Sequence, residues 1–131
     1  MANKRATVLI VDDNDMMRTL LRGMLRGENF EVAGEARNGT AAVEMAGRLK
    51  PDIVCLDVMM PEMDGLEALR AIRSAQPEMT VVMITANASP DNVKEALENG
   101  AAGFIVKPFN AARVLDTLER VLVARTNRSP T

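Results

Sequence analysis

Four short apolar runs in this chain each lead into a polar residue that is able to do chemistry. The runs cover residues 8–11, 53–56, 81–84 and 104–106, and they are followed by Asp12 and Asp13, by Asp57, by Thr85 and by Lys107. If the runs are parallel strands of one sheet, their carboxyl ends lie at one edge, where ligands of open α/β sheets bind. The pattern therefore predicts a site that contains three carboxylates, one hydroxyl and one ammonium group.

Helical patterns alternate with these apolar runs. Apolar residues recur at helical spacing over residues 17–25, 42–49, 66–72 and 114–122. Asp64 is expected to open the third of these helices, and residues 89–91 (Ser-Pro-Asp) predict the start of a further one. Asn99 and Gly100 are a typical helix stop. Five strand–helix units result.

A fifth strand, predicted over residues 30–35, differs from the other four because it includes charged residues. We expect it at an exposed edge, whereas the four apolar runs are typical of strands covered on both faces. Right-handed crossovers leave few topologies. If the acids after strands one and three meet, the fold is a doubly wound, five-stranded parallel α/β sheet of order 2-1-3-4-5. We expect one domain over residues 1–131, with its core at about 5–124 and a polar tail at 125–131.

Composition excludes several function classes. The 131 residues are 47% hydrophobic with a formal net charge of −2, which gives no electrostatic footprint for nucleic acid. There is no histidine, so Ser-His-Asp catalysis and histidine-ligated zinc are excluded. No apolar stretch approaches the roughly 20 residues of a membrane span, and no signal peptide is evident, so we expect a cytoplasmic protein. The single cysteine, Cys55, lies in an apolar run and is expected to be buried and inert.

The predicted site favours phosphoryl chemistry with a hard metal ion. Three clustered carboxylates repel one another unless a cation lies among them, and oxygen-only ligands favour Mg²⁺. Asp57 is the best candidate nucleophile toward a phosphoryl group, because it is a lone acid with Lys107 and Thr85 as helpers. Asp12 and Asp13 would then hold the metal. An acid after a strand is often only a helix N-cap, so the argument depends on the equivalent positions of all these residues.

Four motifs together are characteristic of one family: Asp12 and Asp13, residues 56–65, Thr85 and Ala86, and residues 104–109. In these motifs the sequence resembles the receiver domain of bacterial two-component response regulators, and most of all the single-domain CheY-like chemotaxis regulators. The likeness covers about residues 5–124.

The resemblance implies a set of roles around one phosphoacceptor. Asp57 would accept a phosphoryl group from a sensor histidine kinase. Asp13, Asp57 and the backbone carbonyl of Met59 would bind Mg²⁺, and Asp12 would help through water. Lys107 would contact the phosphoryl group.

The resemblance also implies a conformational switch. Thr85 would move toward the phosphoryl group and Phe104 would turn inward, which changes the face formed by the fourth helix, fifth strand and fifth helix. That face would bind a protein target: a motor switch, a phosphotransfer protein or a kinase. The Lys107–Pro108 bond is expected to be cis. With no effector domain attached, we expect a monomer that signals by protein contact and not an enzyme in the ordinary sense.

Several alternatives remain open at the level of sequence. An aspartyl-phosphate hydrolase would carry an acid–base aspartate at the position of Met59. A flavodoxin-like FMN carrier would need a phosphate-binding loop after the first strand, where residues 12–15 include three aspartates that would repel the phosphate. A phosphorelay intermediate, or a receiver-like binding module that works without phosphorylation, fits the same residues. The choice depends on the site and not on the fold.

Overall fold

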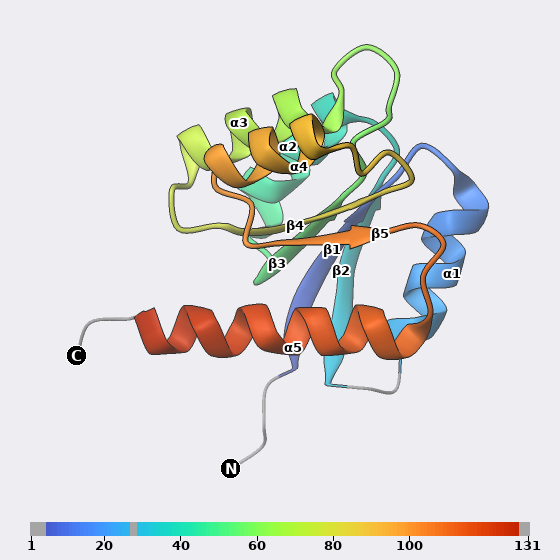
Figure 1. Cartoon of the computed structure of the whole chain (residues 1–131). Coiled ribbons are helices and arrows are strands. Elements are labelled where there is room, and N and C mark those ends of the chain that lie inside the picture. The colour runs from blue at the N-terminus through green and yellow to red at the C-terminus, as the bar shows by residue number, and fades with distance from the viewer. Residues whose placement is uncertain (1–4, 27–28, 129–131) are drawn as a thin grey trace.

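A computed structural model describes residues 5–26 and 29–128, and within them five parallel strands alternate with five helices (Figure 1). The strands are β1 (Ala6–Val11), β2 (Phe30–Ala36), β3 (Ile53–Leu56), β4 (Thr80–Thr85) and β5 (Gly103–Val106). The helices are α1 (Asp15–Leu25), α2 (Gly39–Leu49), α3 (Gly65–Ala75), α4 (Pro90–Glu98) and α5 (Ala111–Arg128).

The sheet has the predicted order, β2-β1-β3-β4-β5, and every pairing is parallel. The charged strand β2 lies at one edge, as expected. Helices α2, α3 and α4 cover one face of the sheet, and α1 and α5 cover the other (Figure 1). The strand order reverses between β1 and β3, so the carboxyl ends of these two neighbours form the crevice of the fold.

Two layers of core explain why the central strands are apolar throughout. Along β1, for example, Leu9 joins the core beneath α2, α3 and α4, whereas Val8 and Ile10 join the core beneath α1 and α5. All three side chains are fully buried. Burial of a side chain of this size contributes about 1.5–3 kcal/mol, so the continuous apolar runs stabilise both layers at once.

Two details of the apolar prediction are wrong. Strand β5 is not covered on both faces, because it lies at the second edge of the sheet and Val106 keeps 49% of its surface exposed. In α1, Leu20 is 48% exposed, while Leu21 and Leu25 are buried. The apolar stripe of α1 is wider than the strip of sheet that the helix covers, so its outer residue remains in solvent.

The predicted helix ends are confirmed by their hydrogen bonds. Asp64 caps α3 in a capping box with Glu67, and the Ser89 side chain accepts a hydrogen bond from the third residue of α4. Asn99 caps the end of α4, and Gly100 follows in a left-handed conformation with φ of 95°. The starts of α3 and α4 mark where the loops that follow β3 and β4 end. In the described part of the chain no helix has both the length and the hydropathy to cross a bilayer.

The last helix extends into the segment expected to be a polar tail. α5 continues to Arg128, and residues 129–131 lie outside the described part. Arg125 donates to the Asp52 carbonyl oxygen at 3.1 Å and pairs with its carboxylate at 3.3 Å, while Thr7 donates to the same carboxylate from its amide. Partial burial acts to raise the pKa of Asp52, but these hydrogen bonds outweigh it and hold that pKa below its usual value. Arg125 therefore has a structural partner that its sequence position did not indicate.

Candidate functional site

Strand pairing brings two of the predicted acids together. Val11, the last residue of β1, pairs with Leu56, the last residue of β3. The Asp57 amide then donates to the Val11 carbonyl oxygen at 3.1 Å, which extends the ladder by one step. Asp12 and Asp57 therefore begin their loops side by side at the crevice between β1 and β3.

The three predicted carboxylates form one cluster. Oxygen atoms of Asp12, Asp13 and Asp57 all lie within 4.8 Å of one another. Asp12 is 2% exposed and Asp57 is 4% exposed, whereas Asp13 faces solvent. Among the described residues, the Asp13 carboxylate has no hydrogen bond or ion pair. This exposed carboxylate is available to bind a ligand.

Lys107 enters the cluster from the end of β5. Its Nζ donates to Asp12 Oδ2 at 2.8 Å and to Asp57 Oδ2 at 3.3 Å. The Lys107 amide is held by the Thr85 carbonyl oxygen at 2.9 Å, and the following peptide bond to Pro108 is cis, as expected. One ammonium among three carboxylates leaves the cluster with a formal charge of −2.

This charge distribution changes the pKa values of two groups. Burial raises the pKa of Asp57, the Lys107 ammonium lowers it, the Asp12 carboxylate raises it again, and the net direction is upward. Burial lowers the pKa of Lys107, but its contacts with Asp12 and Asp57 outweigh this effect and the pKa rises. Lys107 is thus a firmly protonated cation, and Asp57 holds its proton more readily than an exposed aspartate does.

The loop after β3 wraps closely around Asp57. The Met59 amide donates to Asp57 Oδ1 at 3.2 Å. At the start of α3, Gly65 lies so near that a Cβ there would come within 2.0 Å of the Asp57 carbonyl oxygen. Glu62, between them, has φ of 65°. The turn therefore needs the small residue at position 65 in order to bring the start of α3 against the acid.

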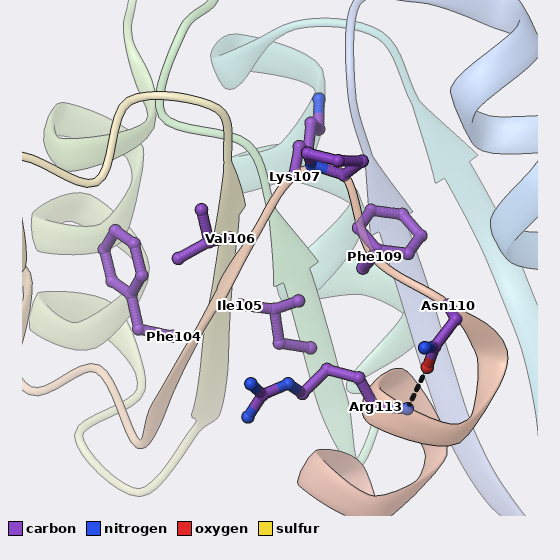
Figure 2. A pocket seen from close by; sticks show the side chains of 8 residues that line it. Phe104, Ile105, Val106, Lys107, Phe109, Asn110 and Arg113 are labelled. Atoms are coloured by element: carbon purple, nitrogen blue, oxygen red, sulfur yellow. Dashed lines mark hydrogen bonds between the residues drawn. The ribbon is translucent and has the colours of Figure 1, made fainter.

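Within the described residues, the side chains of Thr85 and Phe104 make no hydrogen bond to the three carboxylates. Thr85 is fully buried, and its hydroxyl accepts a hydrogen bond from the Asn87 amide at 3.2 Å. Within the described ranges no hydrogen bond joins it to Asp57. Phe104 is half-buried against the core beneath α2, α3 and α4. Figure 2 shows Phe104 and Val106 on one side of β5 and Ile105 on the other.

A groove of about 600 Å³ runs along β5 and into the start of α5, and Phe104, Val106, Phe109 and Arg113 contribute to its lining. Figure 2 shows these side chains around the strand and the turn that follows it. Val106 and, on α4, Leu97 are about half exposed. The groove and these two side chains belong to the α4–β5–α5 surface, and Lys107 itself contributes to the lining of the groove.

Sequence reasoning missed one residue at the site, Arg18 on α1. Its Nη1 donates to the Asp12 carbonyl oxygen at 2.6 Å, and its Nε pairs with Glu35 Oε1 at 3.3 Å. Its side chain is only 13% exposed. Arginine at a polar position of an amphipathic helix gives no motif, so only the folded chain reveals this contact.

Cys55 takes no part in the site. Its thiol is buried in the core beneath α1 and α5, as expected, and burial raises its pKa to about 12. A thiolate is the reactive form of cysteine. The chemistry of the site therefore does not involve a thiol.

Comparison with known proteins identifies the class to which this fold and site belong. Residues 8–119 match the family model of the response regulator receiver domain. The chain belongs to this family. Receiver domains are phosphoacceptor signalling domains and not classical enzymes, and this chain has the acidic pocket and the lysine of a CheY-like receiver.

Within the family, the chain is similar to single-domain chemotaxis proteins. It is 49% identical to the chemotaxis protein CheY of Listeria monocytogenes over 113 residues, which cover 86% of this chain and 95% of the relative. It is 45% identical to the CheY of Thermotoga maritima over 114 residues, or 87% of this chain and 95% of the relative.

Solved structures agree with this placement. The chain resembles a structure of the Borrelia burgdorferi CheX–CheY–BeF₃–Mg²⁺ complex, with a TM-score of 0.84, 35% identity and 89% of each chain covered. It also resembles Vibrio cholerae CheY4, with a TM-score of 0.79 and 36% identity, over 89% of this chain and 98% of the other. The protein is thus a CheY-like receiver domain.

Proposed function

We propose that Asp57 accepts a phosphoryl group from a sensor histidine kinase in the presence of Mg²⁺, and that the α4–β5–α5 surface then binds a protein target in chemotaxis signalling. The observation that carries this proposal is the cluster of three carboxylates within 4.8 Å of one another, paired with a single ammonium group. The surplus charge of −2 matches one divalent cation.

The donor set fits Mg²⁺. Hard oxygen ligands without histidine or thiolate suit this ion, which binds through one or two carboxylates and keeps several waters. Asp13 is the exposed carboxylate that has no hydrogen bond or ion pair among the described residues, and Asp57 lies beside it. Asp13, Asp57 and the backbone carbonyl of Met59 would hold the ion, and Asp12, which is already paired with Lys107, would help through water.

In the transfer step, a carboxylate oxygen of Asp57 attacks the phosphorus atom of the donor. A new oxygen–phosphorus bond forms as the bond from phosphorus to the donor nitrogen breaks, and the nitrogen keeps the electron pair. Mg²⁺, when bound, supplies positive charge against the phosphoryl oxygens. Lys107, whose Nζ lies 3.3 Å from Asp57 Oδ2, supplies a second positive charge, and such positioned charges account for most of the catalysis in phosphoryl transfer.

The same residues connect the site to the proposed target surface. Lys107 directly follows β5, and the Thr85 carbonyl oxygen holds its amide. In the phosphorylated state the Thr85 hydroxyl would leave the Asn87 amide and donate to a phosphoryl oxygen, and Phe104 would turn inward. The groove along β5 would change shape as a result, which is a population shift of a two-state surface.

Two findings support the proposed partner class. The relatives named above are chemotaxis proteins, and one solved structure holds CheX, CheY, BeF₃ and Mg²⁺ together. The half-exposed Val106 and Leu97 give the surface an apolar component that suits a protein partner. A motor switch, a phosphotransfer protein or a kinase would each be able to use it.

The proposal is tested with beryllofluoride, which mimics a phosphoryl group on a carboxylate. With Mg²⁺ and beryllofluoride, backbone amide NMR signals of the wild type should shift at the site and across β5 and the neighbouring helices. Asp57→Asn should show no shift, and Asp64→Asn, a matched change at a helix cap, should behave as the wild type. A wild type that forms no complex would contradict the phosphoacceptor assignment, and shifts confined to the loops around Asp57 would contradict the switch.

Metal binding is tested separately by calorimetry. Asp13→Asn should bind Mg²⁺ at least about tenfold more weakly than the wild type, because it removes the one unpaired carboxylate of the cluster. The Asp64→Asn protein is again the control. Unchanged affinity of the Asp13 variant would remove this residue from the set of ligands.

A further inference from the structure

We propose that Arg18 is a positioning residue for the phosphorylation site, and that it acts through the peptide bond between Asp12 and Asp13. This inference rests on the proposed function, since it assigns to Arg18 the orientation of the carboxylate that binds Mg²⁺. The carrying observation is the hydrogen bond of 2.6 Å from Arg18 Nη1 to the Asp12 carbonyl oxygen.

All three nitrogens of the Arg18 guanidinium have partners. Nη1 binds the Asp12 carbonyl oxygen, Nε pairs with Glu35 at 3.3 Å, and Nη2 pairs with Asp15. The side chain is 13% exposed although it lies on a helix surface. Because the guanidinium is planar and rigid, partners on three sides hold it in one orientation. Arg18 is therefore a fixed support for the loop after β1.

The carbonyl contact orients Asp13 through covalent geometry. The Asp12 carbonyl and the Asp13 amide lie in one planar unit, so a fixed carbonyl fixes the plane from which the Asp13 side chain projects. On the other side, the Asp12 amide is held by the Ala36 carbonyl oxygen at 3.1 Å. The Asp13 carboxylate has no hydrogen bond or ion pair of its own within the described residues. Its direction therefore depends on the backbone that Arg18 holds.

Charge and geometry predict opposite effects for this residue. Arg18 is a cation near a cation site, so the removal of its charge alone would strengthen Mg²⁺ binding. The loss of a supporting contact weakens metal binding, typically by 10- to 100-fold for outer partners of metal ligands. The direction of the change in affinity therefore separates the two roles.

The chain offers a matched control in Arg22. It lies one turn further along α1 and pairs with the second carboxylate oxygen of the same residue, Glu35. Within the described ranges it has no hydrogen bond to Asp12. Arg22→Met therefore removes one positive charge and one ion pair with Glu35, as Arg18→Met does. It leaves the contact between Arg18 and the Asp12 carbonyl oxygen in place.

The experiment measures Mg²⁺ affinity by calorimetry for Arg18→Met, Arg18→Lys and Arg22→Met. We expect Arg18→Met to bind about tenfold more weakly than the wild type. The Mg²⁺ affinity of Arg18→Lys should also fall, since an ammonium group lacks the planar, forked shape of a guanidinium. The affinity of Arg22→Met should stay within about twofold of the wild type. Unchanged or tighter binding by Arg18→Met would overturn the inference, as would full wild-type affinity of Arg18→Lys.

A second readout does not depend on the metal. In the metal-free protein, the Asp13 amide NMR signal should move in Arg18→Met and stay in place in Arg22→Met, and an unmoved signal in both would overturn the inference. Circular dichroism confirms folding, and Arg18→Lys carries the test if Arg18→Met does not fold. If the wild type itself binds no Mg²⁺, the proposed function fails; if it binds and Arg18→Met matches it, only this inference fails.

Discussion

Replacement of Asp57 by asparagine should make the metal-free protein more stable at neutral pH. The side chain keeps its size and can still accept from the Met59 amide, but it loses its negative charge. In the wild type that charge lies within 4.8 Å of oxygen atoms of two other carboxylates and 3.3 Å from the Lys107 ammonium nitrogen. The change therefore removes two repulsions and one attraction.

The magnitude follows from these distances. At an effective dielectric constant of about 20, each repulsion is about 3–4 kcal/mol and the attraction is about 5 kcal/mol. The difference is about 2 kcal/mol, and screening of the exposed Asp13 reduces it toward about 1 kcal/mol. Lys107 keeps its shorter contact with Asp12, so the substitution leaves the ammonium group paired.

The pH dependence has a definite sign. The pKa of Asp57 is raised in the folded protein, so the protonated form stabilises the fold and this contribution is lost as pH rises through the raised pKa. The advantage of Asp57→Asn should be complete at pH 7. It should disappear as pH falls below the usual aspartate pKa of about 3.9.

Urea unfolding in the presence of a chelator measures the effect, with circular dichroism as the probe because the chain has no tryptophan or tyrosine. At a slope of about 2 kcal/mol/M, the midpoint should rise by about 0.5–1 M. Mg²⁺ at about 100 times its dissociation constant should stabilise the wild type by about 2.7 kcal/mol. With the ion present, the wild type should therefore become more stable than Asp57→Asn. A variant no more stable than the wild type in chelator would refute this reasoning.

Three further predictions concern the packing around the site and the far end of the sheet. Gly65→Ala should destabilise the fold by about 1–3 kcal/mol, because the new Cβ would collide with the Asp57 carbonyl oxygen. Gly47→Ala, in open space on α2, should stabilise the fold by about 0.5–1 kcal/mol, and urea midpoints compare the two variants. Asp52→Ala should cost about 1–2 kcal/mol at pH 7, and the cost should shrink as pH falls through the lowered pKa of this residue; an equal cost at pH 7 and at pH 2 would exclude that origin. Cys55 should react with a thiol reagent only after unfolding, which a colorimetric assay in native buffer and in urea detects; rapid labelling of the native protein would contradict its burial.

Sequence patterns predicted the strands of the sheet and the helix caps because both depend on residues that are close together in the chain. A central strand buried on both faces must be apolar throughout. A helix begins where a side chain such as Asp64 accepts a hydrogen bond from a backbone amide of the first turn. The predicted acids lie together because parallel strands end at one edge, and the register of β1 with β3 places Asp12 beside Asp57.

What the sequence did not predict depends on neighbours distant in the chain. Val106 is apolar and still half exposed because β5 is an edge strand, and Leu20 lies beyond the width of sheet that α1 covers. Arg18 gains its importance from the Asp12 carbonyl oxygen and from Glu35, and no local pattern contains that pair of contacts. Patterns therefore located the carboxylates of the site and Lys107, but not Arg18, which holds the backbone between two of them.

The most direct test of the account is the intact mass of the protein after incubation with acetyl phosphate, with Mg²⁺ or with chelator, followed by borohydride reduction and peptide mapping. The wild type should carry one phosphoryl adduct that requires Mg²⁺, maps to Asp57 and is absent from Asp57→Asn. An adduct on the Asp57→Asn protein at the wild-type level, or an adduct that forms equally well in chelator, would contradict this expectation.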